Sequence, residues 1–366
     1  MQRLAPLLAV LAAIWLTGAQ AATPTQAADY IIRQNAAPLK PLFSPPPGQA
    51  AVPVPPAAPV AVAAPQPAVP ERAPIAVLLP LKSEALGDAA DVVRAGIVAA
   101  QGADQGPAVR MYDTTVDNVA QRYREAVANG ARVVIGPLTR PAIAQLAPRV
   151  TVPTLALNTL DGTTANPKLF GLSVSAELEA RQIARLMRQD GMQRPAVITG
   201  SGVLDRRLAA AFASEWTSAA QTPPRSLAAH DPALAGHLAG ADSVFLALID
   251  PAAVPAAVSA LPRYAVSQLA VAHVPAALTG VKVVDMPWLV MARHPAVQRY
   301  PRPAEALTRA TERLYALGID AYRVARDMTV TPPPPGWRLD GVTGDLKLGR
   351  DRQFARTLPV QVLEGQ

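Results

Sequence analysis

Polar side chains that could hold a ligand follow the first well-patterned apolar run in the sequence. Residues 75–79, "IAVLL", predict a buried strand, and Lys82 and Ser83 lie in the polar turn between this run and a predicted helix. In open α/β folds, ligands bind outside the carboxyl ends of the strands. A hydroxyl and the amides of a helix N-terminus can hold a carboxylate there. The turn is therefore a candidate ligand position, and the alternative is a plain loop with a helix cap.

Later apolar runs end in polar residues in the same way. If the strands are parallel, these residues line one cleft that receives a ligand or a partner. The set is Thr139, Arg140, Asn158, Thr159, Ser201, Asp250 and Asp285. For any single member, an ordinary loop group or helix cap is the alternative. Trp288 is a separate candidate: it packs where the chain crosses between lobes or, because Trp is enriched at interface anchors, it contacts a partner.

The sequence offers little support for catalysis. Ser201 lies on a predicted strand-to-helix turn in "ITGSGVLD", but this text is not the G-x-S-x-G of a nucleophile turn. The four histidines, at 230, 237, 273 and 294, have no metal-ligand spacing such as H-E-x-x-H. Phosphate-binding glycine loops of either common type are missing as well. We therefore predict no enzyme activity, no metal and no cofactor.

Composition narrows the class of protein further. Half of the 366 residues are apolar, which is enough for a sizeable core. The net charge of +7 favours acidic partners such as nucleic acid, anionic lipid or wall polymers, although a plain soluble basic protein is the simpler alternative. Nucleic acid is disfavoured because no helix-turn-helix precedes the α/β part. Cysteine is absent, so we expect no disulfide, no thiolate nucleophile and no lipid anchor on cysteine.

The first 74 residues predict export and a spacer. Residues 1–21 carry Arg3, an apolar core and the small-x-small site Ala19-Gln20-Ala21, as a secretory signal peptide does. The apolar core of about 13 residues is short for a membrane span, and no later segment is long enough, so an uncleaved anchor is the minor alternative. Residues 22–74 form a tail and spacer rich in Pro and Ala, which favour extended chain. We expect a periplasmic protein, associated with the outer membrane or the wall if anything holds the spacer.

From residue 75 onward, apolar runs alternate with amphipathic segments. This alternation predicts parallel sheets with right-handed crossovers, arranged as two Rossmann-like lobes of an α/β protein. The first lobe is expected at about 75–173 and 281–328, and the second at about 174–280 and 329–366. The less regular elements expected include a helix at 252–261, a strand at 268–272, a long helix at 302–328 and a closing hairpin around Gly349.

Six stretches of this region resemble one known family. They are "IAVLLPL" (75–81), "VVIGPLTRPAIAQLA" (133–147), "FGLSVSAELEARQIA" (170–184), "VVDMPWLV" (283–290), "ERLYALGIDAYRVAR" (312–326) and "GVTGDLKL" (341–348). Together they are similar to the C-terminal domain of the LpoA family of penicillin-binding protein activators, over residues 75–366. The resemblance implies a type I periplasmic solute-binding fold. Relatives with the full architecture carry a helical-repeat domain and a lipidated cysteine where this sequence has its spacer.

The resemblance implies a non-catalytic periplasmic regulator of peptidoglycan synthesis. Such a protein activates a class A penicillin-binding protein, a bifunctional synthase, by direct contact, and peptidoglycan or a small wall-derived ligand is a further candidate partner. The alternative is a periplasmic receptor that binds an amino acid, peptide or wall fragment for transport or sensing. A receptor should place several hydroxyls and one opposed charge pair around an empty polar pocket. A cleft filled by Leu, Arg or Trp side chains would argue against it.

Overall fold

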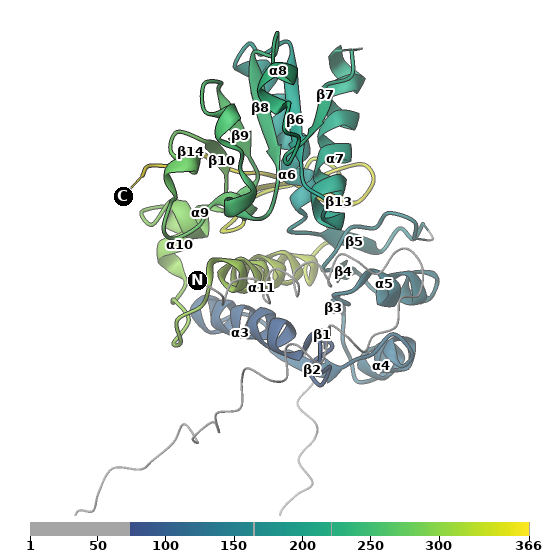
Figure 1. Ribbon diagram of the computed structural model, residues 1–366. Helices are drawn as coiled ribbons and strands as arrows, with labels where there is room; N and C mark the ends of the chain where they lie inside the picture. The colour runs from purple at the N-terminus through teal and green to yellow at the C-terminus, as the bar shows by residue number, and fades with distance from the viewer. Residues whose placement is uncertain (1–73, 164, 221, 366) are drawn as a thin grey trace, which may run out of the picture. The chain divides into compact units, whose positions relative to one another are not determined.

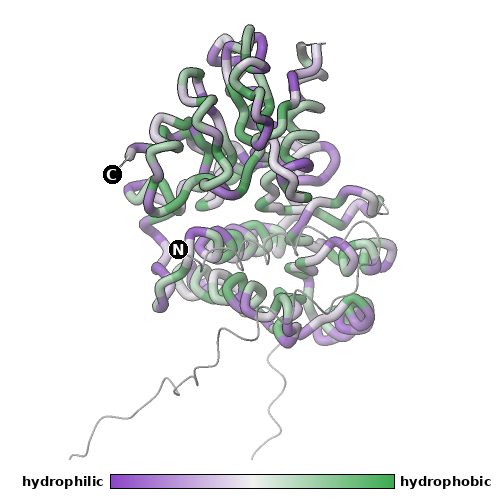
Figure 2. Tube along the Cα trace, viewed as in Figure 1, coloured by the Kyte–Doolittle hydropathy of each residue, from purple (hydrophilic) through white to green (hydrophobic). Residues whose placement is uncertain are grey.

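Two β-sheets organise the part of the chain that this computed structural model describes, namely residues 74–163, 165–220 and 222–365 (Figure 1). The first sheet has eight strands in the order β11-β12-β13-β5-β4-β3-β1-β2, and the second has six in the order β14-β10-β9-β8-β6-β7. Figure 2 shows hydrophobic colour running along the strands and hydrophilic colour mainly in loops and on helices. The expected signal peptide and all but the last residue of the expected spacer lie outside the described residues.

The first sheet is parallel through its first five strands. These are β1 (Ile75–Leu79), β2 (Val109–Asp113), β3 (Val133–Ile135), β4 (Thr154–Ala156) and β5 (Leu169–Leu172). All five residues of β1 are buried, as expected for a parallel strand that is covered on both faces.

Helices cover both faces of this sheet. Residues 75, 77 and 79 belong to the same core as helices α3 (Gly87–Asp104) and α11 (Arg309–Met328). Residues 76 and 78 belong to the core shared with α4 (Val119–Ala128) and α5 (Arg140–Leu146). The strand's period of two thus distributes its side chains between two apolar layers.

The long helix α11 packs closely on α3, side by side with it in Figure 1. Glycines make this approach possible, because a Cβ on Gly96 would lie 2.1 Å from the Tyr315 carbonyl oxygen and one on Gly318 would lie 2.2 Å from that of Val93. Thr308 caps the helix by accepting a hydrogen bond from the amide of Thr311.

The second sheet begins with strand β6 (Pro195–Thr199) and continues through a second parallel series. Its other strands are β7 (Arg225–Ala228), β8 (Ser243–Ala247), β9 (Arg263–Ala265), β10 (Lys282–Val284) and the antiparallel β14 (Val360–Val362). Helices α6 (Ala176–Gln189) and α7 (Val203–Ala220) pack together beside it. The ring of Phe212 on α7 stacks on that of Phe245 on β8, with centroids 4.5 Å apart, which ties the helix to the sheet.

The predicted α/β class with two Rossmann-like, mainly parallel lobes is confirmed. Several local predictions are wrong. The strand expected at 268–272 is instead a short 3-10 turn (Ser267–Leu269) and loop, and the strand β9 precedes it. The helix expected at 252–261 is two 3-10 turns (Pro251–Ala253 and Ala256–Val258), because Pro255 interrupts it. The long helix starts at Arg309 rather than 302, after prolines 301 and 303.

The pairing of strands also corrects the expected lobe boundaries. Strand β10 belongs to the second sheet, although residues 281–328 were expected in the first lobe. Strands β11 (Arg338–Asp340), β12 (Asp345–Leu348) and β13 (Gln353–Thr357) form a meander that extends the first sheet by pairing β13 with β5, although 329–366 were expected in the second lobe. The described chain therefore crosses between the sheets three times, after β5, after β10 and after β13.

Candidate functional site

A cleft with a volume of about 330 Å³ lies between the first lobe, which contributes the start of α5 and the loop after β4, and helices α6 and α7 of the second. Its lining combines three arginines, two acids, two hydroxyls and three apolar residues. The lining residues are Arg140, Thr159, Asp161, Ser175, Glu177, Leu178, Arg181, Arg207, Ala210 and Ala211. We refer to this set as the cleft.

On the first-lobe side, Asn158 positions the polar groups that follow β4. It is fully buried, and its Nδ2 donates to the carbonyl oxygen of Leu138 at 3.0 Å. Its Oδ1 accepts from the amide of Thr159 at 2.9 Å and from Nε of Arg140 at 3.3 Å. Asn158 is therefore a structural support, while Arg140 and Thr159 face the cleft. The hydroxyl of Thr159, a residue only 5 % exposed, has no hydrogen-bond partner within the described structure.

On the second-lobe side, the start of α6 organises a chain of polar contacts. Ser175 precedes the helix and donates its hydroxyl proton to Oε2 of Glu177 at 2.6 Å. The other oxygen of Glu177 pairs with the guanidinium of Arg207 on α7, which joins the two helices across the cleft wall. Arg181 lies one helical turn beyond Glu177, is partly buried, and makes no hydrogen bond or ion pair with any described residue.

The cleft carries an excess of positive charge. Three guanidinium groups face two carboxylates, so the formal balance is one positive charge. The carboxylate of Glu177 is already engaged by a hydroxyl and a guanidinium, whereas Asp161 is exposed at the rim. Such a site favours an anion over a cation, because a guanidinium binds carboxylate or phosphate through paired hydrogen bonds.

The other strand-end residues do not line the cleft. Lys82 is exposed and donates its backbone amide to Oδ1 of Asp113, while the Ser83 hydroxyl accepts from the amide of Leu86 at 3.3 Å. Thr139 is the residue before α5 and stays outside the lining. The structure thus brings together only two of the predicted cleft residues, Arg140 and Thr159, with Asn158 behind them.

Ser201 and Asp250, at strand ends of the second sheet, also lie outside the lining. Both are exposed. The carbonyl oxygen of Ser201 accepts from the guanidinium of Arg206, and the Asp250 carboxylate caps a 3-10 turn by accepting from the amide of Ala252 at 2.9 Å. For these two residues, the structure shows ordinary loop and helix-cap contacts, which the sequence allowed as the alternative to a place in the cleft.

Asp285 lies away from the cleft, in a buried ionic cluster where the chain crosses between lobes. Its side chain is fully buried and forms a bidentate pair with Arg313 of α11, at 3.0 Å from Nε and 2.8 Å from Nη2. Arg309 adds a third guanidinium contact at 3.0 Å, and the amide of Met286 donates to Oδ1. The structure thus places Asp285 outside the cleft lining. Strand-end aspartates look alike in sequence, but two arginines bind the carboxylate of this one.

A second buried pair lies beside the first. Oε1 of Glu179, on α6, is 3.5 Å from Nη2 of Arg356 on β13, and both side chains are 2 % exposed. Burial raises the pKa of Glu179, because loss of solvation outweighs the attraction of Arg356 and Arg313. We call the five charged residues Glu179, Asp285, Arg309, Arg313 and Arg356 the lobe junction.

The lobe junction connects all three crossings of the chain. Glu179 is close to the first, Asp285 begins the second, and Arg356 precedes the third. The amide of Asp285 also donates to the carbonyl oxygen of Pro359 at 3.2 Å, and the side chain of Gln182 exchanges two hydrogen bonds with the backbone of Leu358. A buried ion pair that is hydrogen-bonded in this way resists separation, because breaking it leaves a charge unpaired.

Trp288 lies at the same crossing rather than on a contact surface. It is fully buried, with its ring 5.5 Å from that of Tyr315 and the guanidinium of Arg302 stacked 4.0 Å above it. Of the two roles that the sequence allowed, the structure places it in the packing role.

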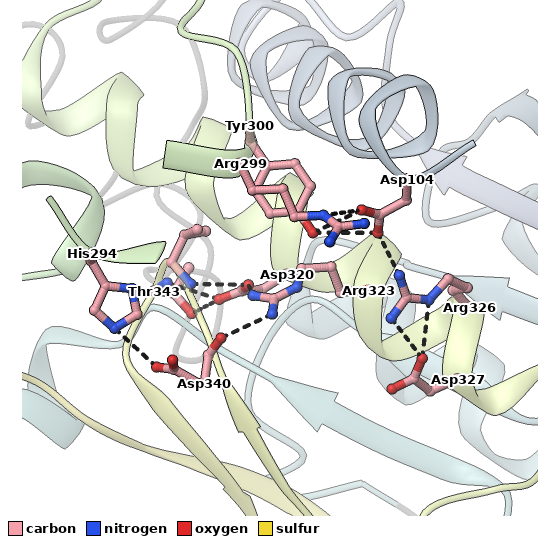
Figure 3. Close-up of polar contacts among 11 residues, drawn as sticks. Asp104, His294, Arg299, Tyr300, Asp320, Arg323, Arg326, Asp327, Asp340 and Thr343 are labelled. Atoms are coloured by element: carbon pink, nitrogen blue, oxygen red, sulfur yellow. Dashed lines mark hydrogen bonds and ion pairs between the residues drawn. The ribbon is translucent and has the colours of Figure 1, made fainter. Parts of the chain in front are cut away.

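A third set of polar contacts holds α11 to its surroundings (Figure 3). Asp320 accepts from the amide and hydroxyl of Thr343 at 2.8 and 2.6 Å, which fixes the turn before β12 on the helix. Asp104, at the end of α3, pairs with Arg299 at 2.7 Å and also with Arg326 at 2.5 Å. Each of these carboxylates is hydrogen-bonded or ion-paired to other groups of the protein, so the set has a structural role.

Sequence reasoning missed the half of the cleft that helices provide. Glu177, Arg181 and Arg207 lie on helix faces, whereas the expectation concerned only strand-end loops. A signal was present, because Glu177 and Arg181 are spaced i,i+4 and therefore share a face of the predicted helix. Asp161 lies in a loop that the sequence did not mark, and Ser175 is the residue before α6.

A comparison with models of known protein families shows which family this chain belongs to. A family model described as "LppC putative lipoprotein" matches residues 44–229 and 236–360. The chain belongs to the LppC family. Among its curated relatives, the penicillin-binding protein activator LpoA of Yersinia pseudotuberculosis serotype O:1b (strain IP 31758) is 26 % identical over 317 residues, which cover 69 % of this chain and 48 % of the relative. The LppC family chain thus spans about half the length of the curated relatives it matches, and the predicted resemblance to the LpoA family is confirmed.

Solved structures confirm the predicted type I periplasmic-binding-protein-like fold. A protein from Chromobacterium violaceum ATCC 12472, described as "a putative branched-chain amino acid ABC transporter", is 54 % identical with a TM-score of 0.74, covering 79 % of this chain and 99 % of that one. The C-domain of LpoA (YraM) from Haemophilus influenzae, described as a regulator of PBP1A, gives a TM-score of 0.66 at 23 % identity, covering 79 % of this chain and 97 % of that one.

Two further observations concern the described residues of this LppC family chain. None of their helices is both long and apolar enough to cross a membrane. Among the same residues, no group of three or more His, Asp or Glu side chains is arranged to hold a metal ion.

Proposed function

We propose that this LppC family protein is a periplasmic regulator that activates a class A penicillin-binding protein by direct contact, without catalysis of its own. The observation that carries the proposal is the match to relatives named penicillin-binding protein activators, which extends over 69 % of this chain. The matching half of those relatives contains the two-lobed domain, so the domain itself is the proposed regulatory unit.

The lobe junction supports a contact role. Any movement that separates Asp285 from Arg313 would leave buried charges unpaired, at a cost of about 3–5 kcal/mol. Motions that preserve this pair are favoured, so the two lobes can present a steady surface to a partner. The polar networks described above use their carboxylates for structure.

The alternative function is a solute receptor, and one observation favours it. The Chromobacterium violaceum relative is named "a putative branched-chain amino acid ABC transporter", and at 54 % identity it is considerably more similar in sequence than the activator that is 26 % identical. The cleft meets the expectation for a receptor only in part: it offers two hydroxyls and opposed charges, but arginine and leucine side chains also line it. Transport or sensing is therefore the second candidate.

A binding and activity assay separates the two functions. The purified full chain is titrated against the class A penicillin-binding proteins of its host, and glycan polymerisation and peptide cross-linking are measured with and without it. We expect saturable binding to one synthase and faster synthesis. The variant Arg181→Gln is the matched control, because a cleft residue should not affect regulation by surface contact. Absence of both binding and stimulation for every synthase would refute the proposal.

The proposed location is the periplasm, with association with the outer membrane or the wall as a finer proposal. Cell fractionation followed by a salt wash tests it, because the positive net charge predicts that wall-bound protein is released as ionic strength rises. Recovery of the protein in the cytoplasm would contradict the location.

A further inference from the structure

A run of four prolines connects the long helix α11 to strand β11. It reads "TPPPPG", residues 331–336, and every residue of it is described. Each residue from 331 to 334 precedes a proline, which restricts it to extended conformations, and each proline has its φ angle fixed at about −65°. None of the described peptide bonds in this run is cis. The run therefore forms a short polyproline II helix.

The rest of the lobe holds this run at both ends. At its start, the amide of Thr331 donates to the carbonyl oxygen of Asp327 at 3.2 Å. At its end, the amide of Gly336 donates to the carbonyl oxygen of Leu348 on β12 at 2.7 Å, and between the two ends Pro333 is buried. The run is thus held in one conformation, which reduces the ordering entropy that a partner must offset on binding.

The outer side of the run is apolar and open to solvent. Pro332 and Pro335 are exposed, and because a polyproline II helix has three residues per turn they share one edge, about 9 Å apart along its axis. Val330, just before the run, is 86 % exposed, the highest value among the exposed large apolar side chains of the described chain. We call Val330, Pro332 and Pro335 the proline ridge. One proline suffices to end a helix, so termination of α11 does not account for the ridge.

We propose that the proline ridge is the element through which this protein contacts its class A penicillin-binding protein, and that the synthase receives it in a groove lined by aromatic side chains. This inference rests on the proposed function, because it names the contact surface that direct activation requires. Aromatic-lined grooves bind polyproline II helices because the conformation is preformed. Proline has no backbone N–H, so the run offers the groove its rings and its carbonyl oxygens.

Two cations beside the ridge indicate the charge of the groove's rim. Lys347 and Arg350 are exposed and make no hydrogen bond or ion pair with any described residue. Leu348 lies between them in sequence and exchanges hydrogen bonds with the backbone of Gly336 and Trp337, so both cations are near the end of the run. An acidic rim would complement these cations and speed association.

Titration of the purified full chain against the class A penicillin-binding proteins of its host tests the contact. The double variant Pro332→Ser/Pro335→Ser should weaken binding to the synthase at least about tenfold, because it removes both rings of one edge. Val330→Ala should weaken it by about threefold, because less apolar surface is buried. Lys347→Gln combined with Arg350→Gln should slow association and lessen its dependence on salt.

Pro275→Ser and Val98→Ala are the matched controls. Pro275 is exposed and extended, with φ −63° and ψ 153°, but no proline adjoins it, and Val98 is 43 % exposed on α3. Neither change should alter the affinity for the synthase. Thermal unfolding of each variant confirms that it folds.

The outcomes separate this inference from the proposed function. If the parent protein binds the synthase and the double proline variant binds equally well, the inference is wrong and the proposed function stands. Equal weakening by Pro275→Ser would also overturn the inference, because the effect would then not belong to the ridge. If the parent protein binds no synthase, the proposed function fails and the inference fails with it.

Discussion

The cleft and the lobe junction use the same kinds of residues for different ends. At the lobe junction, Asp285 accepts hydrogen bonds from two arginines and an amide, and its side chain is fully buried. In the cleft, Arg181 has no described partner and the Thr159 hydroxyl is unsatisfied. The Nε atoms of Arg309 and Arg356 also lack partners, but both guanidiniums are engaged through other nitrogens. The Ser267 hydroxyl and Trp288 Nε1, both near the lobe junction, also lack partners, so an unsatisfied neutral group does not distinguish the two regions. The charged groups do: the carboxylate of Asp285 is fully paired, whereas the guanidinium of Arg181 has no described partner.

Replacement of the central acid of the lobe junction should have the largest effect. Asp285→Asn keeps the shape but leaves the charges of Arg313 and Arg309 unbalanced in a buried site. We expect a loss of about 3–5 kcal/mol in the free energy of unfolding, measured by urea denaturation. The control in the cleft is Asp161→Asn at an exposed position, which should change stability by less than about 0.5 kcal/mol. Similar losses in the two variants would remove the distinction between the regions.

The close contact between α3 and α11, which positions Arg313, should be the next most sensitive. In Gly318→Ala, the new Cβ would lie 2.2 Å from the carbonyl oxygen of Val93. We expect a loss of about 1–3 kcal/mol from overpacking. Gly102→Ala is the matched control in α3, because no atom lies within 4 Å of its Cβ position, and alanine there should stabilise by up to about 1 kcal/mol. If Gly318→Ala were also stabilising, the tight approach would be disproved.

Much of the fold could be predicted because apolar runs and amphipathic segments alternate regularly. The runs at 75–79 and 195–199 are short and mainly apolar, a composition that predicts buried strands, and both are buried parallel strands in the structure. The failures have physical causes. Proline interrupts the segments around 252–261, and strand β7 has only partly buried or exposed residues, so neither carries a clear period. Which sheet β10 and β13 join depends on the free edges of distant strands, which local sequence does not encode.

The cleft could be predicted only in part for a similar reason. Arg140 and Thr159 follow strand ends, and the rule for open α/β sheets locates them. Asp285 follows a strand end as well, but its carboxylate is paired with Arg313, which lies 28 residues later on a helix. Arg181 and Arg207 reach the cleft from helix faces, and only the packing of α6 against α7 brings them together. Long-range pairing thus decides which polar residues remain available.

Two threonines sharpen the comparison further. The Thr343 hydroxyl is fully buried and donates to Asp320 at 2.6 Å, whereas that of Thr159 has no partner. Thr343→Val should cost about 1–3 kcal/mol, because it removes a hydrogen bond to a buried carboxylate. Thr159→Val should leave stability unchanged or raise it by up to about 1 kcal/mol, because it removes an unsatisfied polar group. Equal losses in thermal or urea unfolding would mean that Thr159 has a structural partner.

The smallest expected effect concerns pH and a partly exposed contact between Asp190, which follows α6, and the second sheet. Burial alone would raise the pKa of Asp190, but hydrogen bonds at 2.7 Å from Lys282 and from the Tyr264 hydroxyl outweigh it and lower the pKa. The unfolded pKa is about 3.9, so the carboxylate contributes stability above that pH and loses it as the pH falls through the lower folded value.

Asp190→Asn should therefore be less stable than the parent at pH 6, by up to about 1 kcal/mol for a contact that solvent partly screens. The difference should shrink as the pH falls below about 3.9, because the unfolded carboxylate takes up its proton at a higher pH than the folded one. Urea unfolding of both proteins from pH 6 to pH 3 measures it. Glu179 at the lobe junction provides the opposite sign, since burial raises its pKa, so Glu179→Gln should be most favourable relative to the parent at high pH. If the stability difference for Asp190→Asn grew on acidification, the folded pKa of Asp190 would be raised rather than lowered. The partly exposed carboxylate of Asp190 and the buried carboxylate of Glu179 would then have pKa shifts of the same sign.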